Sequence, residues 1–387
     1  MLSLAEEKTG ELPISSFAME CSRGRLEVID QWADEWRELC ADAVEDQPFY
    51  RPEWIRAFCR KYLGRSKVCI ITAKRDGRLC LLLPLLEQIG TYSKVPIRRL
   101  RSPVNGTCGR FDGPRRRGHE GEAAILATWN YLKRFGSWDL IQFRNALEGS
   151  TVSRIVAAAE ADGFLTTHES DRPNPYVSLP GDLDGLSRMP PNSKLRSQLR
   201  QLRRRLAEKG EVKFSRVETS DRRSLDQFYQ LEASGWKGKI RSCALYDGSK
   251  SFYDDVAEGA ARNGYFSLYK LELEDRLLAA HFSFTHGDRC YSPKVAYDEE
   301  FKPFAPGHLI VAEILRDCID RGIRCYDITG QDQPWKLKWA TGTRAISHHC
   351  IFRGRLARFA HVVQLRLRPV RQFLHRSDDE TGAPEET

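Results

Sequence analysis

The fold is decided by residues 264–330, GYFSLYKLELEDRLLAAHFSFTHGDRCYSPKVAYDEEFKPFAPGHLIVAEILRDCIDRGIRCYDITG. Three apolar runs, 265–273, 277–285 and 290–297, are separated by short charged or glycine-containing turns, a pattern that predicts three consecutive strands. A periodic helix follows over residues 307–321, and a fourth strand over 324–329. The segment therefore predicts a strand meander that leads into a helix whose N-terminus can hold a phosphate.

The elements before this segment repeat the same order. The first half reads as a strand at 25–29, two helices, a hairpin around Asp76-Gly77, a helix at 123–134 and a strand at 139–143. The second half reads as a strand at 212–217, two helices and then the meander. This repetition predicts an α/β fold with two similar units, each with a mixed central sheet, that meet near residue 190. The expected limits are a loose tail at 1–20, a first unit at 21–185, a second unit at 186–355 that includes a connecting helix at 192–210, and a basic segment with an acidic tail at 356–387.

The connecting helix has one apolar stripe and several basic faces. Leucines recur at helical spacing, whereas the other positions are rich in arginine and lysine; the stripe is Leu195, Leu199, Leu202 and Leu206. One interpretation is a docked helix with a solvated basic face. The other is a binding surface for phosphate, RNA or anionic lipid. The basic segment at 353–376 has the same two interpretations, as a helix packed on the core or as a contact with a membrane surface.

Composition indicates which classes of ligand, metal site and cellular location to expect. The 387 residues carry a formal net charge of +8, which suits an anionic ligand or surface without indicating a dedicated nucleic-acid binder. The eleven cysteines show neither a Cys-x-x-Cys motif nor zinc spacing, so we expect reduced thiols and no metal site. The apolar runs are too short to span a bilayer, and the first ten residues do not read as a signal peptide. These observations predict a cytoplasmic protein, with peripheral attachment to an inner membrane left open.

Several short motifs resemble those of a known family. They are Gly235-Trp236-Lys237-Gly238-Lys239, Lys294-Val295-Ala296-Tyr297-Asp298, Ala305-Pro306-Gly307-His308-Leu309, Asp327-Ile328-Thr329-Gly330 and Trp335-Lys336-Leu337-Lys338-Trp339. Together they resemble the cellulose-biosynthesis (CelD-type) branch of the GNAT acyltransferase superfamily, closely over 191–352 and more weakly over 26–177. That branch is also similar to the Fem-type aminoacyl transferases, which are two GNAT units in tandem. The resemblance implies an N-acetyltransferase-type enzyme of bacterial envelope or exopolysaccharide metabolism.

The turn that begins the 307–321 helix is the expected donor site. Free amides of a first helical turn and the helix dipole attract phosphate, and a glycine allows close approach of the backbone. The residues expected to bind an acyl-CoA donor are Lys294, Pro306, Gly307, His308 and Leu309. The turn departs from the usual GNAT loop, Gln/Arg-x-x-Gly-x-Gly/Ala, of which only Gly307 remains. An ordinary capped helix start is the alternative.

The catalytic candidates lie on the predicted strands. Transfer to an amine needs a proton acceptor, a donor to the oxyanion and an acid for the leaving group. His281 is a candidate base, Tyr297 or Tyr291 a candidate acid, and Asp327 a base or a group that orients the amine. Each has a structural alternative, as a packed histidine or tyrosine or as a buried aspartate that caps a turn.

The remaining candidates would contact the acceptor. They are Trp236, Lys237, Tyr291, Lys336 and Lys338, which otherwise serve as packed aromatics and surface lysines. Pro293, in the middle of a predicted strand, indicates a bulge or an edge. A bulge at this position is where GNAT strands separate to admit the acyl donor.

Three functions remain open at this point. The first is transfer of an acyl group, with acetyl as the leading choice, from acyl-CoA to an amine or hydroxyl of a sugar or envelope precursor. The second is a Fem-like transferase that takes its acyl group from aminoacyl-tRNA. The third is a catalytically inactive GNAT scaffold that binds a polysaccharide-synthesis complex or an anionic surface.

Overall fold

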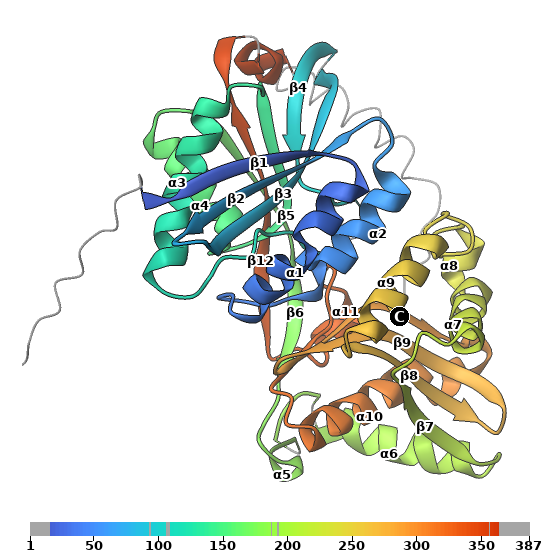
Figure 1. Ribbon diagram of the computed structural model, residues 1–387. Coiled ribbons are helices and arrows are strands. Elements are labelled where there is room, and N and C mark those ends of the chain that lie inside the picture. The colour runs from blue at the N-terminus through green and yellow to red at the C-terminus, as the bar shows by residue number, and fades with distance from the viewer. Residues whose placement is uncertain are drawn as a thin grey trace, which may run out of the picture.

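A computed structural model describes residues 16–92, 94–105, 109–186, 188–191, 193–355 and 357–363 (Figure 1). The predicted tail therefore lies largely outside the described residues, as do Asn192 and most of the C-terminal segment. The first half contains β1 (Ala18–Gly24), α1 (Leu26–Ala41), η2 (Pro48–Tyr50), α2 (Pro52–Tyr62), β2 (Lys67–Arg75), β3 (Arg78–Tyr92), β4 (Val95–Arg101), α3 (His119–Phe135), β5 (Leu140–Leu147), α4 (Thr151–Ala161) and β6 (Leu165–Ser178).

The second half repeats the order of strands and helices. It contains α5 (Leu183–Leu186), α6 (Ser193–Ala207), β7 (Val212–Val217), α7 (Arg222–Ser234), α8 (Trp236–Lys239), α9 (Lys250–Arg262), β8 (Phe266–Leu273), β9 (Arg276–His286), β10 (Arg289–Tyr297), η3 (Glu299–Phe304), α10 (Pro306–Asp320), β11 (Cys325–Asp327), α11 (Pro334–Leu337) and β12 (Gly342–Phe352). The predicted meander, helix and following strand are therefore confirmed as β8 to β10, α10 and β11.

The strands named above form one sheet in the order β1-β2-β3-β4-β5-β12-β6-β11-β10-β9-β8-β7. The pairs β4/β5 and β10/β11 are parallel and the other pairs are antiparallel, so the predicted mixed α/β fold is confirmed. The sequence predicted a mixed sheet for each unit, whereas the two halves share one continuous sheet and meet at its centre. Strand β12, which the sequence placed in the second unit, lies between β5 and β6 of the first, and β6 in turn pairs with β11. The limits proposed for the two units remain a prediction.

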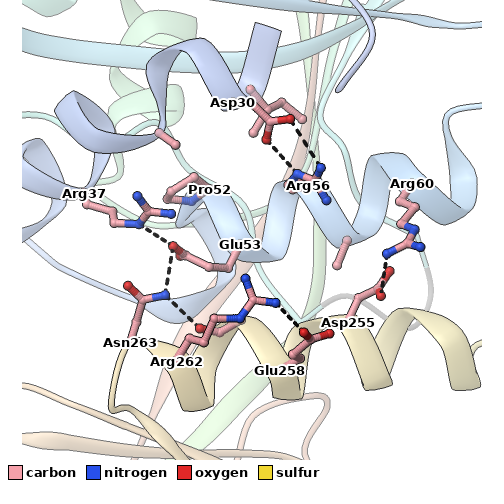
Figure 2. A pocket seen from close by; sticks show the side chains of 14 residues that line it. Asp30, Arg37, Pro52, Glu53, Arg56, Arg60, Asp255, Glu258, Arg262 and Asn263 are labelled. Atoms are coloured by element: carbon pink, nitrogen blue, oxygen red, sulfur yellow. Dashed lines mark hydrogen bonds and ion pairs between the residues drawn. The ribbon is translucent and has the colours of Figure 1, made fainter. Parts of the chain in front are cut away.

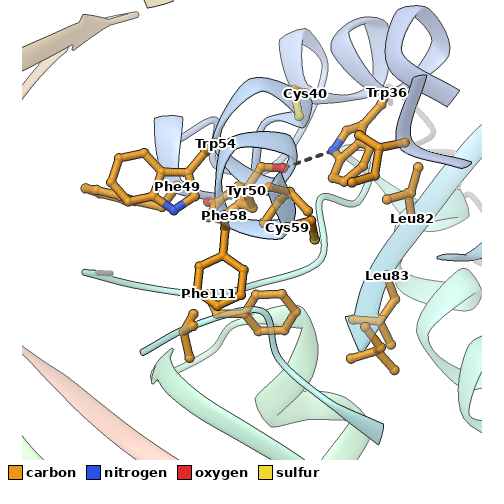
Figure 3. Packing of buried hydrophobic residues seen from close by; sticks show 14 of the residues in the cluster. Trp36, Cys40, Phe49, Tyr50, Trp54, Phe58, Cys59, Leu82, Leu83 and Phe111 are labelled. Atoms are coloured by element: carbon orange, nitrogen blue, oxygen red, sulfur yellow. Dashed lines mark hydrogen bonds between the residues drawn. The ribbon is translucent and has the colours of Figure 1, made fainter. Parts of the chain in front are cut away.

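Two large buried clusters support the sheet. Buried side chains of α1, η2 and α2 belong to the first cluster, in which Figure 3 shows Phe49 beside Trp54 and Trp36 on the side of Leu82 in β3. Phe49 also contacts Tyr291, and Trp54 contacts Phe284, so this cluster reaches into the second half. In the second half, Leu199 and Leu206 of α6 join the cluster around α10. Leu199, Leu202 and Leu206 are buried and Leu195 is half-buried, which favours the interpretation of a docked helix.

Both parallel strand pairs separate after three residues, but the gaps are filled differently. In the first half, residues 110–116 continue the sheet: Phe111 N–H donates to Asn145 O at 3.0 Å, and Arg116 N–H donates to Cys80 O at 2.8 Å. In the second half, the pairing of β10 with β11 ends at Tyr291 and Asp327. A bulge in β10 between Tyr291 and Lys294 confirms the irregularity predicted from Pro293. Side chains, rather than backbone, fill this second gap.

Candidate functional site

The gap between β10 and β11 is lined by backbone carbonyls of the bulged strand. Thr329 Oγ1 donates to Ser292 O at 3.1 Å, and Lys237 Nζ donates to Val295 O at 2.8 Å. These side chains take the place that a third strand or an extended ligand would occupy. Beside them, the hydroxyls of Ser283 and Ser292 lie 2.7 Å apart and are buried. The sheet therefore opens into a small polar centre.

Glu232, on α7, organises the lysines of this centre. Its Oε1 accepts from Lys294 Nζ at 2.6 Å and from Lys237 Nζ at 3.2 Å, and its Oε2 accepts from the Ala244 N–H at 2.9 Å. Burial alone would raise the pKa of Glu232, but the charges of Lys294 and Lys237 lower it below its usual value. Glu232 therefore stays ionised with two cations on one oxygen.

Lys336, on α11, is a third lysine of this centre and contacts carbonyls. Its Nζ donates to Thr329 O at 2.7 Å and to Gln331 O at 3.1 Å. The residue is only 9% exposed. Burial, together with the charge of Lys237, lowers the pKa of Lys336 to about 8. A neutral amine can donate both N–H groups to these two carbonyls and keep its lone pair free.

His281 and Asp327 are both buried, and each is held by a specific partner. His281 Nδ1 lies 2.9 Å from Tyr326 Oη, and burial together with Lys237 and Lys336 lowers the pKa of the imidazole to about 3. The ring is therefore neutral near pH 7 and is a weak base. Both carboxylate oxygens of Asp327 accept from Arg110 Nη2, and Oδ1 also accepts from the Thr329 N–H. Asp327 thus orients the end of β11 rather than facing an open space.

The start of α10 offers less free backbone than the sequence suggested. The N–H groups of His308 and Leu309 both donate to Ala305 O at 3.0 Å, and Pro306 has no N–H. Within the described chain, this leaves the Gly307 N–H as the amide without an assigned acceptor in the first turn. Leu309 is buried, and a Cβ at Gly307 would lie 3.6 Å from the ring of Tyr297, an ordinary contact.

The other predicted residues divide between the centre and its surroundings. His308 Nδ1 accepts from Trp339 Nε1 at 2.9 Å, and burial and Lys338 lower the pKa of His308 to about 4. Tyr291 is buried opposite Asp327 in the β10/β11 pair, and its hydroxyl has no hydrogen-bond partner among the described residues. Trp236 and Lys338 are exposed. The structure therefore brings Lys237, Lys294, Lys336 and His281 together and leaves Trp236 and Lys338 at the surface.

Sequence reasoning missed three residues that hold this site together. Glu232 precedes Lys237 by five positions on an ordinary amphipathic helix, and Arg110 lies in a glycine- and arginine-rich loop of the other half. Thr329 was noticed only as part of a motif. A buried glutamate gives no periodic signal, and the pairing of Arg110 with Asp327 spans 217 positions.

A groove of about 420 Å³ lies between α1, α2 and α9 (Figure 2). Its side chains are mutually paired: Arg37 Nε donates to Glu53 at 2.6 Å, Arg56 Nε to Asp30 at 2.7 Å, and Arg60 Nη1 to Asp255 at 3.0 Å. The groove therefore offers no surplus charge. No cluster of metal-ligating side chains and no helix long and apolar enough to cross a membrane occurs in the described residues.

Comparison with known proteins identifies the second half. Residues 193–337 match the family model described as an acetyltransferase (GNAT) domain. This segment is therefore similar to a GNAT acyltransferase domain. The bulged β10, the separation from β11 and the position of α10 are the features expected of that fold. No curated protein gave a significant match to the sequence.

Three solved structures share the overall fold at low identity. FemX is 14% identical with a TM-score of 0.57, covering 86% of this chain and 97% of its own. The C-terminal domain of a putative lysylphosphatidylglycerol synthetase from Agrobacterium fabrum is 11% identical, with a TM-score of 0.52 and coverage of 88% and 97%. L-PGS from Bacillus licheniformis is 13% identical, with a TM-score of 0.50 and coverage of 82% and 96%. These similarities extend the shared fold over both halves of the chain.

Proposed function

We propose that the chain transfers an acyl group to an amine acceptor at the gap between β10 and β11. The observation that carries this proposal is the buried cluster of Lys237, Lys294 and Lys336 at the point where the two strands separate. Lys237 and Lys294 share one carboxylate, that of Glu232, so these three side chains leave a net positive potential. Such a potential stabilises the negative charge that develops on an acyl oxygen during transfer.

Lys336 is the proposed proton acceptor. Its pKa of about 8 lies close to neutrality, and its contacts to Thr329 O and Gln331 O leave a lone pair for the acceptor amine. His281, with a pKa of about 3, is assigned a supporting role because it orients the hydroxyl of Tyr326. Tyr297, beside Gly307, remains the proposed acid for the leaving group.

The donor that the geometry favours is an aminoacyl ester of tRNA. An extended CoA arm would have to displace Lys237 from Val295 O and Thr329 from Ser292 O, and its pyrophosphate would meet one unassigned amide at the start of α10. The site therefore fits CoA poorly. In contrast, the basic face of α6 lies beside η3, where Arg205 and Lys209 stand over the ring of Phe304 at 5.7 and 5.6 Å. A polyanion bound to α6 would lie beside η3 and α10, and α10 begins at the expected donor turn.

Acyl-CoA remains the second candidate donor, supported by the GNAT domain match over 193–337 and by Gly307. The proposed acceptor is an amine or hydroxyl of a sugar or envelope precursor, as the resemblance to the cellulose-biosynthesis branch implies. Placement in the cytoplasm belongs to the same proposal. A scaffold without catalysis is the outcome if neither donor binds.

Titration with both donors tests the proposal. We expect tRNA to bind with an affinity that falls steeply with salt, and Arg203, Arg204 and Arg205 replaced together by Gln to weaken binding and flatten the salt slope. The matched control replaces the exposed arginines Arg60, Arg222 and Arg262 by Gln. Stoichiometric binding of acetyl-CoA with unchanged tRNA affinity in the α6 variant would instead select the CoA donor.

A further inference from the structure

A surface loop beside the site displays large apolar side chains together with positive charge. The loop joins α7 to α9, and its residues 236–246 read WKGKIRSCALY. Of its three cations, Lys237 pairs with Glu232 and Lys239 with Glu299, whereas Arg241 lies over the ring of Tyr246 at 5.0 Å. Trp236 is 42% exposed, Ile240 63% and Tyr246 49%. We refer to residues 236–246 as the platform. Exposed apolar side chains that gather in one short loop indicate a surface that a partner covers.

The platform is held rigidly from beneath. Glu232, which binds Lys237 and Lys294, also accepts from the Ala244 N–H at 2.9 Å, and Cys243 and Ala244 are fully buried. The Trp236 N–H donates to Glu299 Oε1 at 2.7 Å. Arg241, at φ +56°, occupies the left-handed region, and its N–H is fixed on Gly238 O. The apolar side chains are therefore displayed by a fixed scaffold.

The chemistry of the platform indicates one kind of partner. Tryptophan and tyrosine are the side chains that settle at the boundary between water and lipid, and lysine and arginine beside them attract anionic headgroups. Ile240, the most exposed of the three apolar residues, has no aromatic face on which a nucleic-acid base could stack. We propose that the platform inserts into the headgroup region of an anionic lipid bilayer.

The platform lies next to the proposed site of transfer. Lys237 belongs both to the platform and to the gap between β10 and β11, where its Nζ binds Val295 O. A bilayer that covers Trp236 and Ile240 would therefore lie beside the proposed site of transfer. If the proposed function holds, the acceptor reaches the site from the membrane surface. The lipid contact itself stands whether or not the chain catalyses transfer.

Vesicle flotation with the full chain tests the proposal. We expect binding to vesicles of phosphatidylcholine with phosphatidylglycerol (3:1) and weak binding to phosphatidylcholine alone. Replacing Trp236, Ile240 and Tyr246 together by Ser should lower the partition coefficient at least tenfold. Replacing Lys239 and Arg241 by Gln should lower the partition coefficient about fivefold for each charge removed. This loss should appear only with vesicles that contain phosphatidylglycerol. The matched control is Ile89→Ser, which removes an 82% exposed isoleucine from β3 and should leave binding unchanged.

Two further measurements test whether the platform itself, and not another surface of the protein, binds the vesicles. The melting temperature and the tRNA affinity of the Ser variant should match those of the parent chain. Equal vesicle binding by the Ser variant and the parent would overturn the proposal, as would a loss of vesicle binding in the α6 arginine variant alone. A Ser variant that loses tRNA affinity but keeps its vesicle binding would show that the platform binds RNA instead.

Discussion

Arg110 Nη2 donates to both carboxylate oxygens of Asp327, at 2.8 and 2.7 Å, and joins the two halves of the chain through a fully buried ion pair. Arg110 Nε also donates to Asn174 Oδ1 at 2.9 Å, on β6, the strand that pairs with β11. The loop of the first half thereby fixes the end of the strand on which the proposed site depends.

Removing one partner of this pair should be costly. Arg110→Met leaves the Asp327 carboxylate buried without a cation, and we expect a loss of about 3–5 kcal/mol in the free energy of unfolding. Arg110→Met with Asp327→Asn should recover part of that loss, because the remaining amide is uncharged. Urea unfolding of the two single variants and the double variant measures the coupling. Arg56→Met, at an exposed ion pair with Asp30, is the control and should hardly change the midpoint. A loss in the double variant equal to the sum of the losses in the two single variants would show that the pair is not coupled.

Buried neutral histidine should make the fold sensitive to acid. The pKa of His281 falls from its usual 6.5 to about 3, so the unfolded chain binds a proton near pH 6.5 that the folded chain excludes. The free energy of unfolding is therefore unaffected by His281 above pH 6.5 and falls as the pH drops toward 3. At pH 5 the loss from His281 alone should be about 2 kcal/mol.

His281→Gln tests this source of acid sensitivity. The variant loses the titrating group, so the difference between its unfolding free energies at pH 7 and pH 5 should be smaller than in the parent chain. Its stability at pH 7 is the reference, since any packing cost appears equally at both pH values. The same pH difference in variant and parent would place the acid-sensitive group elsewhere, with His308 and His349 the next choices because burial lowers both pKa values to about 4.

The sequence predicted the order of the elements well because local patterns encode it. The alternating apolar runs of 265–297, the leucine stripe of α6 and the bulge at Pro293 each depend on neighbours within a few positions. The position of β12 between β5 and β6 of the first half was not predictable from such local patterns. An apolar strand of this length suits either half, and its partners Ile141 and Thr166 lie far away in the sequence.

Some residues of the candidate site could likewise be predicted from the sequence and others could not. Lys237, Lys294 and Lys336 were recognised from motifs, because lysines beside tryptophan or proline stand out in a sequence. Their common partner Glu232 and the link from Arg110 to Asp327 depend on tertiary packing alone. The number of free amides at the start of α10 also could not be read from the sequence. It depends on Ala305, whose backbone adopts the left-handed conformation and turns its carbonyl toward two following N–H groups.

The proposed role of Lys336 predicts a pH profile. If the neutral amine accepts the proton, kcat should rise with pH and level off above about 8, the pKa that burial gives this lysine. Lys336→Arg keeps the charge but cannot lose its proton, so kcat should fall by about 100-fold or more and the inflection near pH 8 should disappear. Transfer is followed with whichever donor binds in titration. A Lys336→Arg enzyme with the same inflection would assign the proton acceptor to another group, whereas a raised KM with unchanged kcat would make Lys336 a binding residue only.

The last prediction concerns Gly307 and distinguishes binding at α10 from binding elsewhere. The Cβ of Ala at this position would stand 3.6 Å from the Tyr297 ring, so Gly307→Ala should fold normally and weaken donor binding modestly. Gly307→Val adds two methyl groups beside the amide that has no assigned acceptor, and it should abolish donor binding. Arg316→Val, at an exposed position of the same helix, carries the helix cost of valine without touching the site. Melting temperatures and affinities for tRNA and acetyl-CoA are measured on all three variants. Because the strands before the turn are unchanged, the melting temperatures should shift by only a few degrees. Normal affinity for both donors in a folded Gly307→Val protein would place the donor away from the start of α10.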